Sequence, residues 1–160
     1  SVYVAGLPDA ADRPDKFIIV EVDPSRLDKL KAVHAKLETD LVFEYVLNRT
    51  AQPNDALLAG LPAGSLVINA TGLGKDRPGS PLTDAAVFPE NGLVWELNYR
   101  GERQFMHQAL GQAEARRLTV VDGWDYFLYG WSQVIAEVFH LDLTSEKFAA
   151  LDKAAAAIKS

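Results

Sequence analysis

Short apolar runs alternate with amphipathic stretches along most of this chain. The run at 17–22 is β-branched and nearly continuous, which is typical of a strand buried on both faces of a sheet. Asp23 and Pro24 follow it as a helix N-cap with proline in the first turn, and apolar residues then recur at steps of three and four. Residues 1–7 fit either a strand or the last turns of a helix. Further strands are predicted at 42–47, 65–69, 93–99 and 118–121, and helices at 24–37, 55–61, 101–117, 124–139 and 145–158, with one helical turn at 83–88.

This alternation of strands and helices predicts an α/β fold. Helices between successive strands favour right-handed crossovers and a parallel sheet. We therefore expect a doubly wound parallel sheet in one domain, because 160 residues match the size of an ordinary globular domain.

The clearest functional signal is the loop that follows the predicted strand at 65–69. Apolar residues stop there and small or polar ones begin, in the order LVINATGLGKDRPGSPL over residues 66–82. Open α/β sheets bind their ligands in the crevice beyond the carboxyl ends of the strands. The first candidates for contact with a small molecule are therefore Asn69, Ala70, Thr71 and Gly72.

Composition and charge narrow the class of partner. The formal net charge of −6 and a pI near 5.0 argue against nucleic acid or an anionic membrane, because no run of basic residues offsets phosphate repulsion. The chain has no cysteine, and its three histidines are too scattered to suggest a metal site. No apolar stretch is long enough to span a bilayer. These features favour a cytoplasmic enzyme or binding domain whose partners are small molecules or other proteins.

The sequence signal for a dinucleotide-binding site is weaker. Such a site needs a glycine-rich turn between its first strand and first helix, and the GxGxxG pattern is absent. The acidic residue that usually comes later is present as Glu21, at a strand end where it would accept hydrogen bonds from the adenosine ribose hydroxyls. Glu21 and Asp23 fit a solvated strand end and a helix cap equally well, so spacing alone leaves both interpretations open.

Three short motifs occur in one order at familiar spacing: VINATGLG at 67–74, ELNY at 96–99 and VDG at 121–123. From residue 17 to the end, the chain resembles the shikimate and quinate dehydrogenase family. That family carries an Asn-Ala-Thr loop, an acidic-X-X-Tyr strand end and an Asp-Gly turn that opens a helix. The resemblance implies a Rossmann-like NAD(P)-binding domain. It also implies an oxidoreductase that moves a hydride between nicotinamide and a shikimate- or quinate-like hydroxy acid.

The resemblance further implies that much of the enzyme lies outside residues 1–160. In the family an N-terminal substrate domain supplies the catalytic Lys and Asp, and nothing here resembles it, so no catalytic residue is assigned to this chain. The first strand and its glycine-rich turn also fall before residue 1. In the strand order 3-2-1-4-5-6 that strand is central, so the remaining strands should form two separate edges. We therefore expect a partial Rossmann domain of a longer polypeptide, inactive when isolated.

Cofactor selectivity is expected to depend on residues 21–26. Family members selective for NADP carry Asn-Arg-Thr after their second strand, with the Arg facing the 2′-phosphate. This chain has Glu21, Val22 and Asp23 there, and carboxylates repel a phosphate but suit a free ribose diol. NAD is therefore preferred, with NADP as the alternative because Arg26 lies one turn into the helix and could meet a phosphate. An Asn-Arg-Thr at 48–50 follows the next strand, and the preference reverses to NADP if the strand count is off by one.

Nicotinamide and substrate contacts are implied at two later strand ends. Tyr99 matches the family tyrosine near the bound acid, Gly123 matches the glycine beside the nicotinamide, and Leu97 is assigned to the cofactor. The family's substrate-binding Gln aligns with Gly130, which has no side chain to donate, and Gln133 one turn later is the substitute. This departure suggests a hydroxy or keto acid other than shikimate. Aromatic residues at 124–131 crowd the same helix, and such clusters usually lie in a core or a domain interface.

Three hypotheses about function therefore stand. The first is an NAD(P)-dependent oxidoreductase of the shikimate dehydrogenase type, with a second copy of itself as a further partner. The second is a non-catalytic member that serves as a ligand sensor or subunit. The third is a generic Rossmann-like domain whose motif matches arose by chance. A Lys, an Asp and a glycine-rich turn upstream would favour the first hypothesis, and their absence would favour the second.

Overall fold

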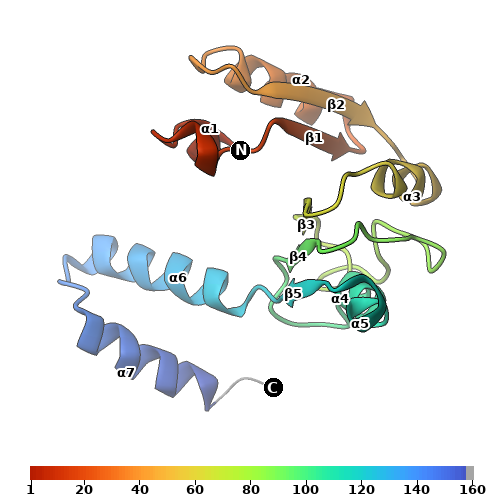
Figure 1. Cartoon of the computed structure of the whole chain (residues 1–160). Helices are drawn as coiled ribbons and strands as arrows, with labels where there is room; N and C mark the ends of the chain where they lie inside the picture. Colours follow the sequence, from red (N-terminus) through yellow and green to blue (C-terminus); the bar gives the residue numbers. More distant parts are fainter. Residues whose placement is uncertain (158–160) are drawn as a thin grey trace. The chain divides into compact units, whose positions relative to one another are not determined.

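A computed structural model describes residues 1–157 of the chain, and its elements are labelled in Figure 1. Contacts between residues cluster into two compact units, residues 1–54 and the part from residue 55 onward. Each unit contains its own parallel sheet, one of two strands and one of three. The two units are described separately below.

The first unit is built on a pair of parallel strands. Strand β1 pairs with β2 in register from Lys16 opposite Val42 to Glu21 opposite Leu47. The side chain of His34 is buried against this pair, stacked on Phe43 at 4.2 Å between ring centroids. The elements of this unit are α1 (Val2–Ala5), a short 3-10 helix (Ala10–Asp12), β1 (Lys16–Glu21), α2 (Pro24–His34) and β2 (Val42–Leu47).

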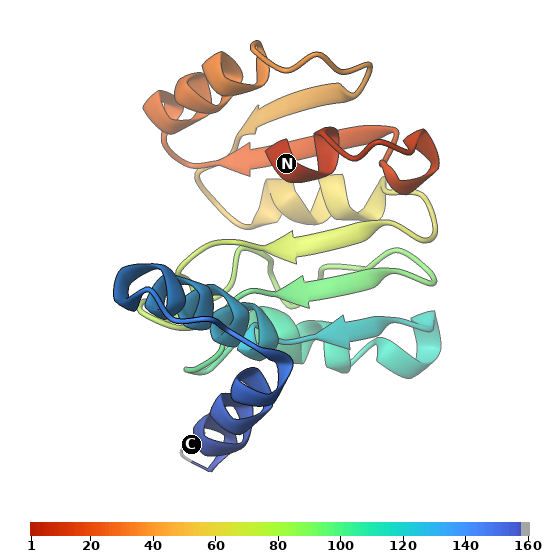
Figure 2. The same ribbon diagram turned by 90° about the vertical axis from the view of Figure 1, so that its left-hand side faces the viewer.

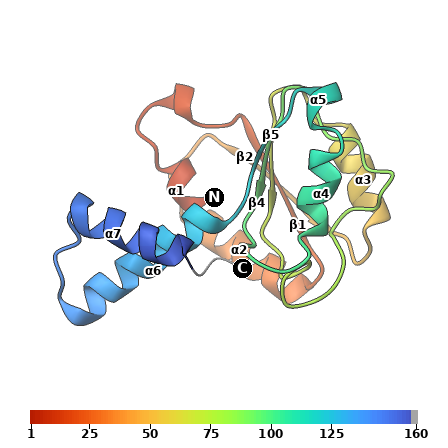
Figure 3. The same ribbon diagram turned by 90° about the horizontal axis from the view of Figure 1, so that it is seen from below.

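The second unit is built on three parallel strands in the order β3-β4-β5, which run side by side in the same direction (Figure 2). Helices α3, α4 and α5 lie on one side of these strands, whereas α6 and α7 extend away on the other (Figure 3). The division between the units falls within the first turn of α3. The elements are α3 (Gln52–Ala59), β3 (Leu66–Asn69), β4 (Leu93–Glu96), α4 (Gln104–Leu110), α5 (Ala113–Arg116), β5 (Thr119–Val121), α6 (Trp124–Phe139) and α7 (Ser145–Ala156).

The core of the second unit lies on the helix-covered face of its sheet. Val94, in the central strand, is fully buried, and Phe88 and Phe105 meet edge to face at 5.6 Å between ring centroids. Val67 and Val120 from the neighbouring strands pack against the same cluster. Side chains alternate between the faces of a strand, so every second residue contributes to this core.

The opposite face of the same sheet is open and apolar. Leu66 and Ile68 of β3 are 50% and 42% exposed, and Leu93 and Val121 of the neighbouring strands are also exposed. The edge-to-face contact between Trp95 and α6 covers one end of this face. Burial on both faces was predicted for the run at 17–22, and that prediction is wrong, because Val20 and Val22 are 39% and 57% exposed.

The predicted α/β class is confirmed, because every strand pair is parallel and helices connect the strands in a Rossmann-like order. The strands form two separate sheets, as predicted for a sheet without its central strand. The bounds of β2 and α6 agree with the prediction at both ends, and residues 2–5 are the helical alternative at the start of the chain. The predicted end of the last helix, residue 158, lies outside the described residues.

Several predicted boundaries are wrong. Helix α2 ends at His34 rather than at residue 37, because the N–H groups of Lys36 and Leu37 make tighter bonds to the carbonyls three residues earlier. Helix α3 begins at Gln52, three residues earlier than predicted. Strand β4 ends at Glu96 rather than at residue 99, because the next residues bend back into a hydrogen-bonded loop.

Two predicted helices are also corrected. Residues 83–88 contain a turn rather than a helix, because Gln112 bonds to the backbone of Ala86 and Phe88 and holds the segment in a non-helical conformation. The side chain of Gln108 also donates to Asp84 within the segment. The predicted helix 101–117 is two shorter helices that break at Gly111. Glycine is a poor residue for the interior of a helix.

Candidate functional site

The loops that follow β3, β4 and β5 lie together at the carboxyl edge of the three-stranded sheet. Their anchor is a pair of buried polar residues, Asn69 and Glu96, which are the last residues of β3 and β4 and lie opposite each other in register. They are 1% and 0% exposed. Asn69 Nδ2 donates to both carboxylate oxygens of Glu96, at 3.1 and 2.9 Å. A buried carboxylate is costly without such partners, so this pair is a specific feature of the edge.

The loop after β3 is shaped by hydrogen bonds to its own side chains. Asn69 Oδ1 accepts from both the N–H and the hydroxyl of Thr71, at 3.0 and 2.7 Å. Thr71 Oγ1 in turn accepts from the N–H of Leu73 at 3.2 Å. Ala70, Thr71 and Gly72 are exposed. The small side chains of this loop leave its backbone open to a ligand.

The loop after β4 is fastened to the loop after β3. Asn98 donates through its backbone N–H to Glu96 Oε1 at 2.9 Å and through Nδ2 to the carbonyl of Leu73 at 3.0 Å. The backbones of Gly101 and Gly74 pass so close that a Cβ on Gly101 would lie 2.3 Å from the carbonyl oxygen of Gly74. Gly101 has φ +84°, a conformation that favours glycine. The two loops therefore form one rigid rim.

The loop after β5 joins the same rim through Gly123. A Cβ at Gly123 would lie 2.0 Å from the carbonyl oxygen of Leu97, so only glycine permits the observed contact between the two backbones. Asp122 of this loop pairs with Arg103, 3.3 Å from Oδ2 to Nη1. Three strand ends that are far apart in sequence are thus fixed relative to one another.

Tyr99 lies on this rim, and its ring contacts an aromatic ring and a cation. Phe127 of α6 stacks on the ring at 4.0 Å between centroids, and Lys75 Nζ lies 5.3 Å from the same ring. Asp76 forms ion pairs with Lys75 at 3.5 Å and with Arg100 at 3.1 Å. The tyrosine is therefore held in one orientation by its neighbours.

The electrostatics of the rim are dominated by Glu96. Burial raises the pKa of Glu96, and hydrogen bonds from Asn98 and Asn69 and the charge of Arg103 partly oppose that rise. The hydrogen-bond pattern fits a carboxylate, since each oxygen of Glu96 receives an N–H.

The candidate residues of the first unit follow β1. The carboxylate of Glu21 accepts from the N–H groups of Val22 and Asp23 at 2.7 and 3.1 Å. Asp23 caps α2, and hydrogen bonds with Ser25 lower the pKa of its carboxyl group. Arg26 lies 3.7 Å from Asp23 in an exposed ion pair. This strand end therefore presents two carboxylates, and the guanidinium group of Arg26 is already paired with Asp23.

The structure brings together most of the predicted residues of the second unit, with one exception. Asn69, Thr71, Leu97, Tyr99 and Gly123 all belong to the rim described above. Gln133 is exposed on α6, and its amide donates to Glu137 on the same helix at 3.1 Å.

Sequence reasoning missed the structural roles of Glu96, Asn98 and Gly101. A signal was present for Glu96, because an acidic residue two positions after Val94 falls on the buried face of its strand. An acid at such a position needs an internal partner. The close approach of Gly101 to Gly74 left no comparable signal in the sequence.

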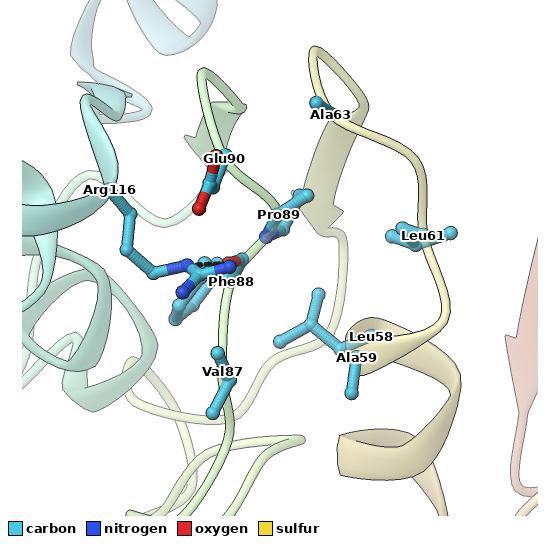
Figure 4. Close-up of a pocket in the computed structure, with 9 residues that line it drawn as sticks. All are labelled: Leu58, Ala59, Leu61, Ala63, Val87, Phe88, Pro89, Glu90 and Arg116. Atoms are coloured by element: carbon cyan, nitrogen blue, oxygen red, sulfur yellow. Dashed lines mark hydrogen bonds between the residues drawn. The ribbon is translucent and has the colours of Figure 1, made fainter.

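A hollow of about 240 Å³ lies at the opposite edge of the same sheet, where the strands begin. Leu58 and Phe88 form part of its apolar wall, and Arg116 donates through Nε to the carbonyl of Phe88 (Figure 4). The guanidinium thus supports the wall of the hollow. No residue predicted to bind a cofactor or substrate lines it.

Metal ions and membranes are two further kinds of partner to consider for residues 1–157. No group of three or more His, Cys, Asp or Glu side chains is placed to hold a metal ion in that range. Within the same range no helix has both the length and the apolar character needed to cross a membrane.

The fold and the rim define a parallel α/β protein whose loops at the carboxyl ends of β3, β4 and β5 are joined by hydrogen bonds and close backbone contacts. The particular relatives that match it are the shikimate dehydrogenases (NADP(+)) of two strains of Caulobacter vibrioides, each 36% identical over 89 residues. The match covers 56% of this chain and 30% of each relative, so the chain spans less than two thirds of their length. These partial relatives confirm the resemblance to shikimate dehydrogenases. No protein-family model and no solved structure matches the chain.

Proposed function

We propose that this chain is most of the nucleotide-binding part of an NAD(P)-dependent oxidoreductase of the shikimate dehydrogenase type. The enzyme transfers a hydride between nicotinamide and a shikimate- or quinate-like hydroxy acid. The observation that carries the proposal is the rigid rim at the carboxyl ends of β3, β4 and β5, where open α/β sheets bind their ligands. The partial match to two shikimate dehydrogenases supports the same reaction class.

The residues at the rim fit the nicotinamide half of the cofactor. The small, exposed residues Ala70, Thr71 and Gly72 leave room for a ribose, and Leu97 and Gly123 form the close backbone contact beside it. When bound, the nicotinamide ring supplies or accepts the hydride. The role of the chain is to hold and orient that half of the cofactor.

We assign the adenosine ribose to Glu21 and Asp23, and we propose NAD as the preferred cofactor. Two carboxylates at this strand end would repel a 2′-phosphate, and they suit the hydroxyls of a free ribose. Arg26, in the first turn of α2, is already paired with Asp23. The relatives are named as NADP(+) enzymes, so this proposal predicts a difference between this chain and those relatives. NADP remains the alternative cofactor.

Tyr99 and Gln133 are proposed as substrate contacts. Phe127 fixes the ring of Tyr99, and the hydroxyl of Tyr99 can form a hydrogen bond with a polar group of the acid substrate. Gln133 has an exposed side chain whose bond to Glu137 can be exchanged for one to a ligand. Because Gly130 offers no side chain, we propose a hydroxy or keto acid other than shikimate.

We further propose that the catalytic Lys and Asp lie in an N-terminal domain of a longer, cytoplasmic polypeptide, and that this polypeptide forms homodimers. An open apolar face remains on the sheet, at Leu66, Ile68, Leu93 and Val121. Doubly wound sheets are covered by helices on both faces, so this face supports the proposal that the protein contains further polypeptide. By itself the fragment 1–160 would be inactive.

The test is a spectrophotometric assay of the full-length protein at the absorbance band of reduced nicotinamide. It pairs NAD or NADP with shikimate, quinate and simpler hydroxy acids. Turnover with NAD is expected to exceed turnover with NADP, and the reverse would contradict the role of Glu21. Cofactor binding without turnover on any acid would favour the ligand sensor, and no binding of either cofactor would refute the proposal.

A further inference from the structure

A closed ring of hydrogen bonds ties the ligand loop to the end of β4. The ring starts at the carboxylate of Glu96 and runs in two directions that meet at Leu73. One branch passes through the side chains of Asn69 and Thr71 to the N–H of Leu73. The other passes through the backbone N–H and the side-chain amide of Asn98 to the carbonyl of Leu73.

The chemistry of Glu96 sets the direction of every bond in the first branch. A carboxylate only accepts, so Asn69 must turn its Nδ2 toward Glu96 and its Oδ1 toward Thr71. Oδ1 also only accepts, so the hydroxyl of Thr71 donates its hydrogen to Oδ1 of Asn69. The hydroxyl oxygen then has two lone pairs, of which one receives the N–H of Leu73 at 3.2 Å. The other remains for a ligand.

We propose that Glu96 is a positioning residue that makes the hydroxyl of Thr71, an exposed residue, a hydrogen-bond acceptor for a hydroxyl of the nicotinamide-side ribose. Glu96 is fully buried and acts only through Asn69, without touching the ligand. The inference rests on the proposed function, and it adds a residue that the predicted cofactor site did not contain.

Glu96→Gln tests the direction of the bonds without changing the shape of the side chain. The new amide brings an NH2 group toward the NH2 group of Asn69, so Asn69 reorients and the Thr71 proton loses its acceptor. Cofactor affinity of the full-length protein, measured by the fluorescence of reduced nicotinamide dinucleotide, is expected to fall by about three- to tenfold, as for the loss of one hydrogen bond. Glu90→Gln is the matched control, because Glu90 is exposed and paired with Arg117 at 3.8 Å. It should bind as the wild type does.

Variants of Thr71 separate positioning from a merely structural role. Thr71→Val removes the acceptor and should weaken binding as much as Glu96→Gln does, whereas Thr71→Ser should restore wild-type affinity. Combining Glu96→Gln with Thr71→Val should cost no more than Thr71→Val alone, because both remove the same bond. Fully additive losses, or wild-type affinity in Thr71→Val, would overturn the proposal. The valine variant is informative even if Glu96→Gln does not fold, since Thr71 is exposed.

Amide hydrogen exchange without cofactor keeps this inference distinct from the proposed function. Glu96→Gln should speed exchange at the N–H groups of Thr71 and Leu73, and Glu90→Gln should not. Unchanged exchange in Glu96→Gln would overturn the role of Glu96 in the ring whatever the ligand is. A wild-type protein that binds no nicotinamide nucleotide would overturn both the proposed function and the ligand contact of Thr71, even where the exchange data support the ring.

Discussion

Replacing Gly123 by alanine should force two of the strand-end loops apart. The new Cβ would lie 2.0 Å from the carbonyl oxygen of Leu97 and 3.0 Å from the carbonyl carbon of Asn98. Gly123 has φ −85° and ψ 7°, which alanine can adopt. The perturbation is therefore steric contact between loops and not backbone strain.

The size of the effect follows from that distance. Cβ atoms essentially never approach a neighbouring atom within 3.0 Å, so the backbones at Gly123 and Leu97 must separate by about 1 Å. Overpacking of this kind costs about 1–3 kcal/mol of the free energy of unfolding. The movement also shifts the contact proposed for the nicotinamide, so cofactor affinity should fall with stability.

Gly130→Ala is the matched control, because it makes the same chemical change within α6, the helix that Gly123 caps. No atom lies within 4 Å of a Cβ at Gly130, and the residue lies in the interior of α6. Alanine there should stabilise the protein by roughly 0.5–1 kcal/mol through helix propensity. Urea unfolding of the full-length variants, followed by tryptophan fluorescence, measures both changes. A Gly123→Ala variant as stable as Gly130→Ala would refute the close contact between the loops.

Three further predictions concern single side chains. Glu21→Ala should weaken NAD binding by up to about tenfold and raise the affinity for NADP relative to NAD in cofactor titrations. Asp28→Ala, on the exposed side of α2, is the control. An unchanged ratio of the two affinities would contradict the selectivity argument. Burial raises the pKa of Glu96 above its ordinary value of 4.5, so the folded protein holds that proton more tightly than the unfolded chain does. The stability of the wild type relative to Glu96→Gln should therefore be greatest below pH 4.5 and fall as the pH rises through the raised pKa; a difference that grows with pH would contradict this. Gln112→Ala removes bonds to the backbone of Ala86 and Phe88 and should cost about 1–3 kcal/mol in urea unfolding, whereas an unaffected variant would show that these bonds do not hold the segment.

Local sequence signals were sufficient for much of the fold. The boundaries of the Val- and aromatic-rich run at 42–47 and of the apolar stretch at 124–139 could be predicted, because the residues that stop each element lie next to it in the chain. The small, polar loop after β3 was recognisable for the same reason. Its position at a carboxyl strand end followed from the parallel α/β order alone.

Long-range contacts decided what local signals could not. A helical turn was predicted at residues 83–88, yet the backbone of this segment bonds to Gln112, which lies 24 residues beyond Phe88 and 26 beyond Ala86. The open apolar face of β3, β4 and β5 was also invisible in the sequence, since an apolar residue has the same identity whether or not a helix covers it.

The segment 66–82 shows most clearly what the sequence determines and what it does not. The sequence by itself determined that a loop of small and polar residues follows β3, because the apolar run ends there. Only the tertiary structure showed that Glu96 anchors this loop, 27 residues from its partner Asn69. Strand pairing brings those residues into register, and a buried carboxylate acquires its role only from the donors that the fold places around it.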